Sequence, residues 1–392
     1  MRIGVVRETA PGERRVSLVP DGVARLVRAG HAVFVQSGAG AASYYPDEQY
    51  VKAGATVTED PSIVFGADVV LHIRPSPDGE PGRSWPVPGA VLVGTLAPLS
   101  DPRLTARAAQ TGLTAFSLDT MPRISRAQSM DVLSSMSTIA GYYAVVWAAS
   151  RLPKLFPLLM TAAGTIAPAR VLVLGAGVAG LQAIATAHRL GATVQAFDTR
   201  PVVKEQVESL GASFLTLDVT GAQTAEGYAQ QLAEDVHARE LALLRDPVAA
   251  ADVVVTTAQV PGSRAPELVT ADMVDAMRPG SVIVDLAAET GGNCARSVPG
   301  EVVEAGGVTV FAPLNVPSLM PVHASQLYSR NVVNFLTHLI ERGLSRPESG
   351  GAWRWDAQDE ICRRTCVAHA GEILHEAVRE RLAQKGGDAD AR

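Results

Sequence analysis

Glycines stand at the first, third and sixth positions of the run Gly175–Gly180, directly after the apolar segment Val171–Leu174. In this spacing the first glycine permits a tight turn, the second lets backbone approach a pyrophosphate, and the third lets a helix pack closely on a strand. The N-terminus of such a helix offers free N–H groups and a partial positive charge to phosphates. The run therefore predicts a dinucleotide-binding turn. Its cofactor-binding residues would be Gly175, Gly177, Val178, Ala179 and Gly180.

A carboxylate stands where a site of this kind reads the ribose. Asp198 follows the apolar run Thr193–Phe197, about 20 residues after the glycines, where a carboxylate accepts hydrogen bonds from the adenosine ribose hydroxyls. A 2′-phosphate would meet like charge, so the sequence predicts NAD rather than NADP. Thr199 and Arg200 complete the segment, and Arg200 softens the rejection of a 2′-phosphate. Three glycines alone indicate only a tight turn, but the strand, the helix and the acid together favour NAD binding.

Two sets of alternating elements must position these residues. Short apolar runs alternate with helix-like stretches in the first 120 residues and again after residue 170, which predicts parallel sheets covered on both faces. The expected strands are Arg2–Val6, Ala32–Gln36, Val69–Ile73, Ala90–Leu96, Thr114–Ser117, Val171–Leu174, Thr193–Phe197, Phe214–Leu217, Val253–Thr256, Val282–Asp285 and Val308–Phe311. The expected helices are Pro20–Ala29, Pro46–Ala53, Asp101–Gln110, Gly180–Leu190 and Lys204–Leu210.

Other segments connect or follow these sets. Ile139–Ala149 is apolar on every side of a helix, so we expect it to be buried and to pass between domains. The polar stretch Asp218–Asp246 has turn chemistry in its first half and a helical pattern over Tyr228–Leu244, and long loops of this kind are usually functional or mobile. Helical patterns return over His323–Arg342 and Asp356–Gln384, and the C-terminal helix is expected to return to the first domain.

The predicted fold class is α/β, with two Rossmann-like, doubly wound parallel-sheet domains joined by long helices. The first domain comprises residues 1–128 and about 322–392, and the NAD(H)-binding domain comprises residues 129–321. A length of 392 residues, 47% of them hydrophobic and 19% charged, is typical of two globular domains. The net charge of −6 offers nothing like the basic footprint of nucleic-acid binding.

The cysteine content and the apolar segments of the sequence indicate the cellular compartment. Three cysteines are too few for a disulfide framework and favour a reducing interior. The N-terminus lacks the long apolar segment of a secretory signal. The best membrane candidate, Leu155–Gly180, is interrupted by Pro157, Pro168 and Arg170, so no direct membrane insertion is expected.

Four longer motifs are more specific than the glycine run. They are MPRISRAQSMDVLSSMSTIAGYYAV, MTAAGTIAPARVLVLGAGVAGLQAIATA, TRPVVKEQVESLG and MRPGSVIVDLAAETGGNC. With them the chain resembles the NAD(H)-binding alpha subunit of proton-translocating NAD(P) transhydrogenase, from RETAPGERRVSLVP to HASQLYSRNVVNFL. The resemblance implies a homodimer that passes a hydride directly to NADP+ on an NADP(H)-binding beta subunit, while a membrane-spanning subunit couples this to proton movement. It also implies a cytoplasmic protein held on the inner face of the cell membrane through these partners.

The resemblance also implies site residues in the segment 123–134. The family's Arg-Gln-Asp loop matches Arg123, Gln128 and Asp131. Arg123 and Asp131 would position the nicotinamide and its ribose, with Ser134 beside them, and Gln128 would reach toward the other nucleotide. Hydride transfer between two nicotinamides needs close approach and orientation but no general acid or base, because no proton changes hands. Residues of these types, without a histidine, suit that reaction; without the resemblance they indicate only a surface loop.

Two tyrosines and several departures complete the comparison with the family. Tyr228 matches a mobile loop that closes over NAD(H), and Tyr142 matches a tyrosine near the nicotinamide. Four residues depart from the family pattern and put details of dimer contacts and interdomain bonds in doubt: Met136, Tyr143, Trp147 and Leu319.

Alanine dehydrogenase resembles the same segments and is the main alternative. Arg15 matches its substrate arginine, but Arg74 stands where its lysine is expected, and Glu289 replaces an aspartate. Its catalytic histidine is expected where Ala97 stands, and loss of that histidine removes the acid/base group that a carbonyl reduction needs. A non-catalytic NAD-sensing module is a second alternative.

Two further groups of residues have a structural interpretation. Cys362, Cys366 and His369 have a spacing that could hold a metal on a helix, but a structural zinc needs four ligands, so packing of a helix face is favoured and no metal is expected. Arg14 and Arg15, beside Glu13, are expected to form a solvated pair with it unless the chain is an alanine dehydrogenase.

Overall fold

The computed structural model describes residues 1–75, 85–216, 229–259, 263–347 and 351–389. These form two compact units, Met1–Met136 with Pro317–Arg392, and Ser137–Val316. Each unit has a largely parallel sheet with helices, which confirms the predicted fold class.

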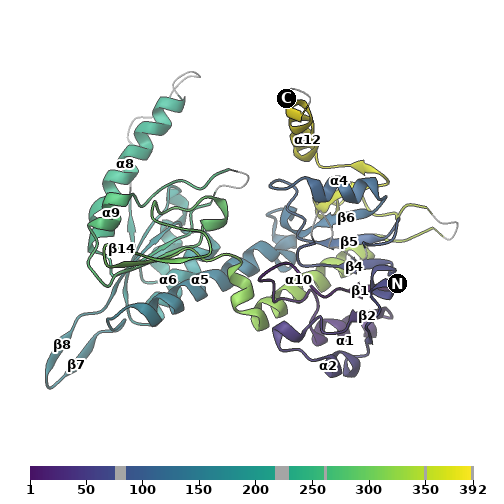
Figure 1. The fold of residues 1–392 in the computed structure, drawn as a ribbon, viewed down its shortest axis with the longest axis horizontal. Helices are drawn as coiled ribbons and strands as arrows, with labels where there is room; N and C mark the ends of the chain where they lie inside the picture. The colour runs from purple at the N-terminus through teal and green to yellow at the C-terminus, as the bar shows by residue number, and fades with distance from the viewer. Residues whose placement is uncertain (76–84, 217–228, 260–262, 348–350, 390–392) are drawn as a thin grey trace. The chain divides into compact units, whose positions relative to one another are not determined.

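The first unit is built on an eight-stranded sheet. Its strands are β1 (Arg2–Val5), β2 (Ala32–Gln36), β3 (Thr56–Thr58), β4 (Val69–Leu71), β5 (Val91–Gly94), β6 (Thr114–Ser117), β16 (Cys366–His369) and β17 (Glu372–Ile373). Their order is β17-β16-β6-β5-β4-β1-β2-β3, and every pair from β6 to β3 is parallel. Figure 1 shows β6, β5, β4, β1 and β2 following one another across this unit. The central strands β4 and β5 are wholly buried, which explains their uninterrupted apolar sequences.

Helices flank this sheet and come from both ends of the chain. They are α1 (Pro20–Arg28), α2 (Asp47–Lys52), α3 (Pro61–Phe65), α4 (Arg103–Gln110), α10 (Pro321–Glu341), α11 (Glu360–Thr365) and α12 (Glu376–Ala389), with the 3-10 turns η1 (Ala41–Ser43), η2 (Leu118–Thr120), η3 (Ser125–Met130) and η6 (Val316–Leu319). Helix α1 begins with Pro20 in the first turn, where the missing N–H costs nothing, and buries Val23 and Leu26. Helix α10 contacts both α1 and η3, so the C-terminal segment is part of this unit.

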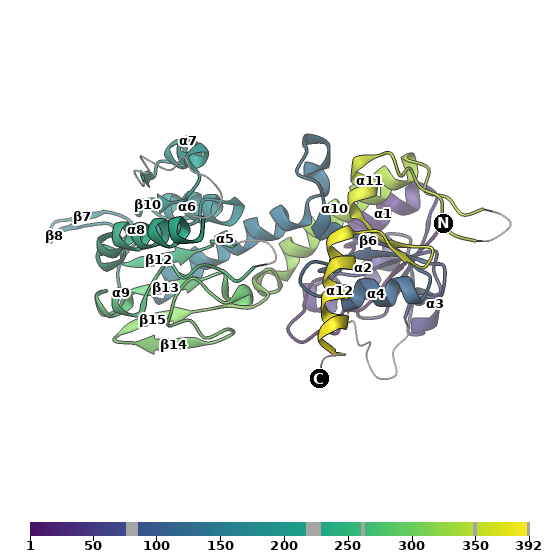
Figure 2. The same cartoon turned by 90° about the horizontal axis from the view of Figure 1, so that it is seen from above.

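The second unit is built on a seven-stranded sheet. Its strands are β9 (Arg170–Leu174), β10 (Thr193–Phe197), β11 (Ser213–Leu215), β12 (Val253–Thr256), β13 (Val282–Asp285), β14 (Val302–Ala305) and β15 (Val308–Phe311). The order is β11-β10-β9-β12-β13-β15-β14, parallel except for the edge pair β14–β15, and Figure 2 shows the strands running from β10 to β14. Helices α6 (Val178–Arg189), α7 (Lys204–Ser209), α8 (Ala229–Ala250) and α9 (Ala271–Asp275) and the turns η4 (Pro201–Val203) and η5 (Ala288–Thr290) complete it.

Alternating residues of these strands supply two hydrophobic cores. In β9, Val171 and Val173 pack into the core that includes α6, whereas Leu172 and Leu174 pack into the core that includes α8 and α9. Both faces of the sheet are therefore covered, as parallel strands require. The switch in strand order on either side of β9 is the place where such sheets bind nucleotides, beyond the carboxyl ends of the strands.

Helix α5 (Val132–Arg151) begins in the first unit and continues into the second. The prediction that its apolar segment is buried all round is only partly correct: Ala144, Val145 and Ala148 are buried, but Tyr142 and Val146 are more than one-third exposed. Among the described residues, α5 is the one helix long and apolar enough to cross a membrane by length and composition, and 39% of its apolar window is buried within the protein.

Two segments differ from the sequence prediction. The expected helix over Asp356–Gln384 is α11, then the hairpin β16–β17, then α12, because Ala370 and Gly371 adopt left-handed backbone conformations that turn the chain back. Near the start of the second unit, β7 (Leu159–Thr161) and β8 (Gly164–Ile166) form an antiparallel hairpin that was not predicted. The sequence prediction also missed β3, α3, α9 and β14, which are all short.

Candidate functional site

The glycine run forms the strand-turn-helix that its spacing predicts. Strand β9 ends at Leu174, Gly175 turns the chain with a φ of +96°, and Gly177 is the N-cap of α6. The Gly175 N–H donates to the carbonyl of Phe197 at 2.8 Å, so the turn stays attached to β10. The free N–H groups of the first turn of α6 lie beyond the carboxyl end of β9, where an anionic pyrophosphate is favoured.

Glycine is favoured at each of the three positions for a different steric reason. A Cβ at Gly180 would lie 1.8 Å from the carbonyl oxygen of Gly175, so only glycine lets the helix approach the strand. A Cβ at Gly175 would lie 2.6 Å from Oγ1 of Thr257. At Gly177 a Cβ would have no described atom within 4 Å, which leaves this backbone open to a ligand. The neighbouring Ala179 is half-buried and Val178 is exposed.

Asp198 follows β10 and is bound to the glycine turn by a hydrogen bond. Its Oδ2 accepts the Ala176 N–H at 2.7 Å, and its side chain is 7% exposed. Arg200 binds the same carboxylate, with Nε 2.9 Å from Oδ1 and Nη2 2.9 Å from Oδ2, and its backbone N–H also donates to Oδ1 at 2.9 Å. Thr199, between them, and Arg200 itself are both exposed.

The carboxyl group of Asp198 is stabilised as an anion. Partial burial alone would raise its pKa, but the hydrogen bonds from Arg200 and from the Ala176 N–H outweigh burial and lower the pKa below its ordinary value. Asp198 is therefore a charged acceptor at neutral pH. Such a group accepts hydrogen bonds from ribose hydroxyls and repels a 2′-phosphate.

A second set of polar residues supports the turn and is absent from the sequence prediction. Thr257, after β12, donates through Oγ1 to the carbonyl of Gly175 at 3.0 Å. Asn293 holds the next residue, accepting the Ala258 N–H at 3.0 Å and donating to the Ala258 carbonyl at 2.9 Å. The buried Asp285 accepts the Asn293 N–H at 2.8 Å. The signal was present, since Thr257 and Asp285 stand at the carboxyl ends of neighbouring parallel strands.

The segment 123–134 brings together two of its four predicted site residues. Oδ1 of Asp131 accepts the Ser134 N–H at 2.9 Å and Oδ2 accepts the Ser134 hydroxyl at 2.6 Å. This is the geometry of an N-cap, and it begins α5. Arg123 and Gln128 lie on the surface, and the Gln128 carbonyl accepts the Asp131 N–H at 3.4 Å. Asp131 thus has a structural role as a cap, and its role at the nicotinamide stays a prediction.

The turn η3, within this segment, is held on the first unit by side chains from the C-terminal region of the chain. Asn331 and Asn334 of α10 donate to the Ser129 carbonyl at 2.9 and 3.1 Å. Nη1 of Arg126 lies 3.2 Å from Oδ2 of Asp359, which caps α11. The segment is therefore anchored at two points.

The remaining predicted residues are distributed as follows. Tyr142 is 41% exposed on α5, and Tyr228 lies outside the described residues. Of the departures, Trp147 stacks on Phe311 with ring centroids 4.3 Å apart, so it supplies apolar packing in the second unit. Three more are placed without a distinctive contact: Met136 is buried, Tyr143 is half-buried and Leu319 is exposed.

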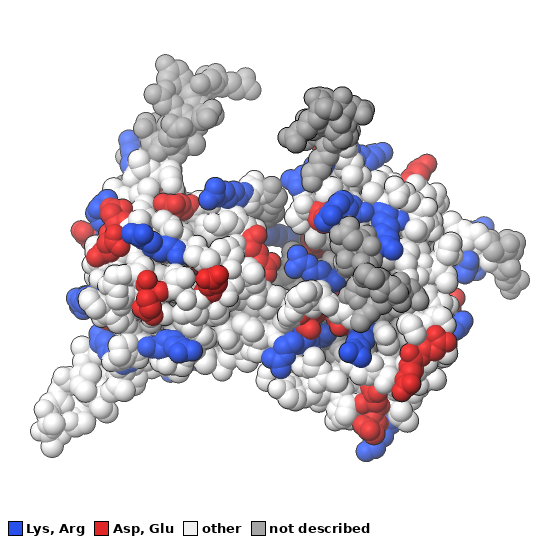
Figure 3. Space-filling view, in the orientation of Figure 1, with Lys and Arg blue, Asp and Glu red and all other residues white. Residues whose placement is uncertain are grey.

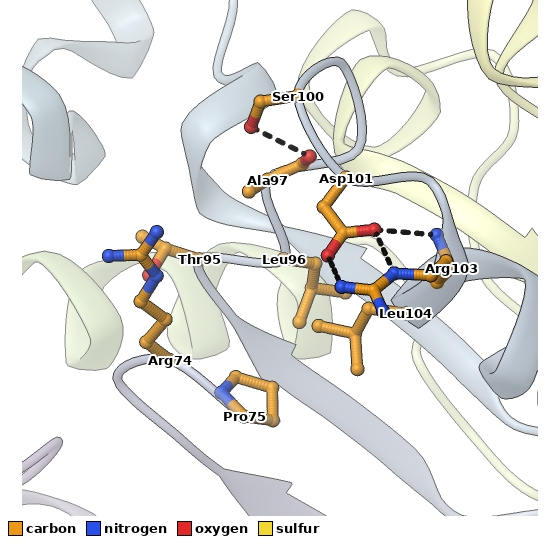
Figure 4. A pocket seen from close by; sticks show the side chains of 9 residues that line it. All are labelled: Arg74, Pro75, Thr95, Leu96, Ala97, Ser100, Asp101, Arg103 and Leu104. Carbon is orange, nitrogen blue, oxygen red and sulfur yellow. Dashed lines mark hydrogen bonds and ion pairs between the residues drawn. The ribbon is translucent and has the colours of Figure 1, made fainter. Parts of the chain in front are cut away.

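A pocket of about 200 Å³ opens in the first unit, beyond the carboxyl ends of β4 and β5. Figure 4 shows Ala97 and Arg74 on its wall, with Asp101 held by Arg103. The two bonds of that ion pair measure 2.9 and 2.7 Å. Ala97, where the sequence resemblance places the histidine expected of an alanine dehydrogenase, offers only a methyl group, and its left-handed backbone donates a 2.9 Å hydrogen bond to the half-buried Asp119. Among the described residues that line this pocket, none supplies an imidazole for proton transfer.

Arg15, the other residue expected at an alanine-binding site, is already paired with Glu13. Its guanidinium forms two hydrogen bonds to Glu13, at 2.8 and 2.6 Å, and the side chains are only 9% and 1% exposed. The expectation of a solvated pair is therefore wrong, because Ser318 covers it and donates to Glu13 at 2.6 Å. Burial opposes charge on Glu13, but the bonds from Arg15 and Ser318 lower its pKa below the ordinary value. Glu289 lies in the second unit, where its carboxylate accepts the Asn315 N–H at 2.7 Å.

The cysteine and histidine spacing does not form one helix face. Cys362 lies on α11, whereas Cys366 and His369 lie on β16, which corrects the predicted helical packing. Cys362 instead approaches His338 and Asp359, with all three potential ligand atoms within 4.8 Å of one another. Burial raises the pKa of the Cys362 thiol to about 12, and Asp359 already accepts from His338 at 2.9 Å and from two backbone N–H groups. His338 and Asp359 are therefore already hydrogen-bonded to each other.

Comparisons with known proteins agree with this geometry. Residues 4–140 match the family model described as alanine dehydrogenase/PNT, N-terminal domain, and residues 144–376 match its C-terminal domain. An NAD(P) transhydrogenase alpha-subunit chain of Rhodospirillum rubrum is 42% identical and is covered over 99% of its length by 96% of this chain. A solved transhydrogenase structure from Sinorhizobium meliloti is 41% identical, with a TM-score of 0.83 over 95% of this chain and 100% of that one.

The likeness to alanine dehydrogenase is weaker. The enzyme of Bacillus subtilis is 30% identical over 88% of this chain and 86% of its own length. This identity is lower than the 42% found for the transhydrogenase alpha subunit of Rhodospirillum rubrum. The chain belongs to the alanine dehydrogenase/PNT family and, within it, to the NAD(P) transhydrogenase alpha subunits.

Proposed function

We propose that this chain is the NAD(H)-binding subunit of a proton-translocating NAD(P) transhydrogenase and transfers a hydride directly between NAD(H) and NADP(H) on a partner subunit. The observation that carries the proposal is Ala97 in the pocket of the first unit, where a dehydrogenase acting on alanine would need an acid/base group. Direct hydride transfer needs no such group. The dinucleotide turn and Asp198 supply what it does need, a bound nicotinamide nucleotide.

The residues have separate roles in this proposal. Gly175, Gly177 and Gly180, with Val178 and Ala179, form the pyrophosphate-binding turn. Asp198 binds the adenosine ribose beside Thr199 and Arg200. The segment 123–134 orients the nicotinamide end through Arg123, Asp131 and Ser134, while Gln128 reaches toward the second nucleotide. Two tyrosines, Tyr142 and Tyr228, complete the nicotinamide surroundings.

We propose that the hairpin β7–β8 makes the homodimer. All six residues of its strands are exposed, and Met160 is 72% exposed although it is strongly apolar. Figure 3 shows this hairpin without acidic or basic side chains on the visible face. An uncharged, apolar arm of this kind is costly to leave in water and is typical of a contact between subunits. A second copy of the chain offers the same arm and so a symmetric contact.

The other partners follow from the reaction. The relatives that are 38% and 42% identical are named as alpha subunits, and a subunit is one component of a larger enzyme. We therefore propose an NADP(H)-binding beta subunit and a membrane-spanning subunit as partners. The chain would then lie on the cytoplasmic side of the membrane, attached through them.

The test mixes the purified chain with an NADP(H)-binding partner subunit, NADH, NADP(H) and an NAD+ analogue whose reduced form absorbs at a different wavelength. Hydride exchange from NADH to the analogue, dependent on both proteins and on NADP(H), is expected. A second cuvette holds the chain alone with NAD+ and L-alanine. NADH formation there would establish alanine dehydrogenase instead, and NADH binding without exchange would leave only an NAD-sensing module.

A further inference from the structure

The acceptor positions of the Asp198 carboxylate are all occupied by the chain itself. A carboxylate offers about four lone-pair positions. Oδ1 accepts the backbone N–H and the Nε of Arg200, and Oδ2 accepts the Ala176 N–H and the Nη2 of Arg200. The four distances lie between 2.7 and 2.9 Å.

These four bonds differ in how readily they can be exchanged. The two backbone bonds belong to the turns after β9 and β10. The other two come from the guanidinium of Arg200, whose side chain is 54% exposed while Asp198 is 7% exposed. An exposed arginine can leave into water, where its charge remains solvated. The adenosine ribose also donates two hydroxyl hydrogens, and it needs the same two positions.

We propose that Arg200 is a displaceable occupant of the ribose-binding carboxylate, which weakens NAD(H) binding and narrows the discrimination against NADP(H). The inference rests on the proposed assignment of Asp198 to the ribose. When NAD(H) binds, the ribose hydroxyls replace the guanidinium on both carboxylate oxygens. A nucleotide with a 2′-phosphate has no 2′-hydroxyl to donate, and the guanidinium beside Asp198 offsets the repulsion between the two anions.

The size of the effect follows from the exposure of the Arg200 side chain. An ion pair whose arginine is half in water contributes little because solvent screens it, so removal of Arg200 should tighten NADH binding about two- to fivefold. The direction of the change in NADH affinity distinguishes this proposal from the alternatives. An arginine that simply attracts phosphates, or binds the ribose itself, would weaken NADH binding when removed.

The experiment measures dissociation constants of NADH and NADPH for the purified chain by nicotinamide fluorescence. R200A and R200Q should bind NADH about two- to fivefold more tightly and NADPH more weakly than the wild type. K204A is the matched control, because Lys204 is a half-exposed cation four residues away whose ion-pair partner is Glu208. The K204A substitution should change the dissociation constants of NADH and NADPH in the same direction.

A double-mutant cycle with Asp198 completes the test. In a D198N background, the R200A substitution should no longer tighten NADH binding, because the contested anion is gone. Weaker or unchanged NADH binding by R200A in the wild-type background would overturn the proposal. Unchanged NADH binding by D198N would overturn the ribose assignment and the proposal with it. Hydride exchange is not measured, so the outcome is independent of whether transhydrogenation occurs.

Discussion

Two carboxylates in this chain combine a structural bond with a proposed contact to the nucleotide. Asp198 accepts the Ala176 N–H of the glycine turn, and Asp131 caps α5 through Ser134. Substitutions at these positions must therefore preserve an acceptor, or loss of the local fold will be mistaken for loss of binding. Asparagine meets this need, since it keeps one carbonyl oxygen and removes the charge.

For Asp198→Asn, we expect NADH affinity to fall about tenfold or more, because hydrogen bonds to a charged acceptor contribute more than those to a neutral one. The affinity for NADPH should fall less, since the repulsion between the Asp198 carboxylate and the 2′-phosphate disappears. Fluorescence titration measures both. Asp275→Asn, which removes an equal charge from an exposed pair with Arg296 in the same unit, should leave both affinities unchanged.

For Asp131→Asn, hydride exchange should slow about tenfold while the NADH dissociation constant changes less than about twofold, because its role is to orient rather than to hold. The cap survives, since asparagine is as good an N-cap as aspartate. Asp60→Asn, at the N-cap of α3 in the same unit, is the control and should leave exchange intact. Equal losses of rate and affinity would show that Asp131 is a binding residue only.

At the residue level the sequence predicted the strand-turn-helix of the glycine run because its signal is local. The glycine spacing and Asp198 lie within one strand-turn-helix-strand segment. The burial of Glu13 and Arg15 could not be predicted, because the covering Ser318 comes from the other end of the chain. The occupation of Asp198 by Arg200 needed coordinates, since adjacency alone does not show which way the side chain turns.

At the scale of elements, long apolar strands were predicted and short or exposed ones were not. Strands β9, β12 and β13 are buried central strands, and their nearly uninterrupted runs of valine, leucine and isoleucine identify them. Strand β16 lies in a stretch that reads as a helix, and only the turn at Ala370 and Gly371 separates it from β17. The arm β7–β8 has no alternation of buried and exposed residues because both of its faces are exposed.

The close contact between α6 and β9 gives a paired prediction. Gly180→Ala places a Cβ against the Gly175 carbonyl, so stability should fall by roughly 1–3 kcal/mol and NADH binding should be lost. Gly177→Ala meets no described atom, so its melting temperature should match the wild type although the methyl group obstructs the pyrophosphate. Calorimetry and fluorescence titration distinguish them. A stable, NADH-binding G180A would contradict the packing argument.

The anchor at Asp359 predicts a dependence of stability on pH. Burial alone would raise its pKa, but bonds from His338, the Cys362 N–H and Arg126 lower it well below the ordinary value of 3.8. A depressed folded-state pKa contributes stability above about pH 4, and that contribution is lost as the pH falls further. Asp359→Asn should cost roughly 2–4 kcal/mol at pH 7. In urea titrations, the difference from wild type should shrink below about pH 4; a constant difference would refute the charge argument.

At the scale of the whole molecule, the proposed dimer depends on one small arm. Met160→Glu places a charge on its most exposed apolar residue and should convert the dimer to a monomer in light-scattering measurements. NADH affinity should be unchanged, because the arm contributes nothing to the nucleotide turn. Val302→Glu, at a 50% exposed apolar position on β14, should remain dimeric. A wild-type chain that is already monomeric would remove the basis of the proposal.

The interrupted order of the first unit has a consequence for synthesis. Strand β6 pairs with β16, which lies roughly 250 residues later in the chain. Translation of that stretch takes on the order of 10 to 50 s at ribosomal rates. Throughout that time the backbone of β6 is an unpaired edge, open to association with other nascent chains. The middle unit, Ser137–Val316, is continuous and can be complete before the segment that closes the first sheet has been translated. A released chain that ends at Val316 should therefore carry a protease-resistant second unit and a protease-sensitive first one.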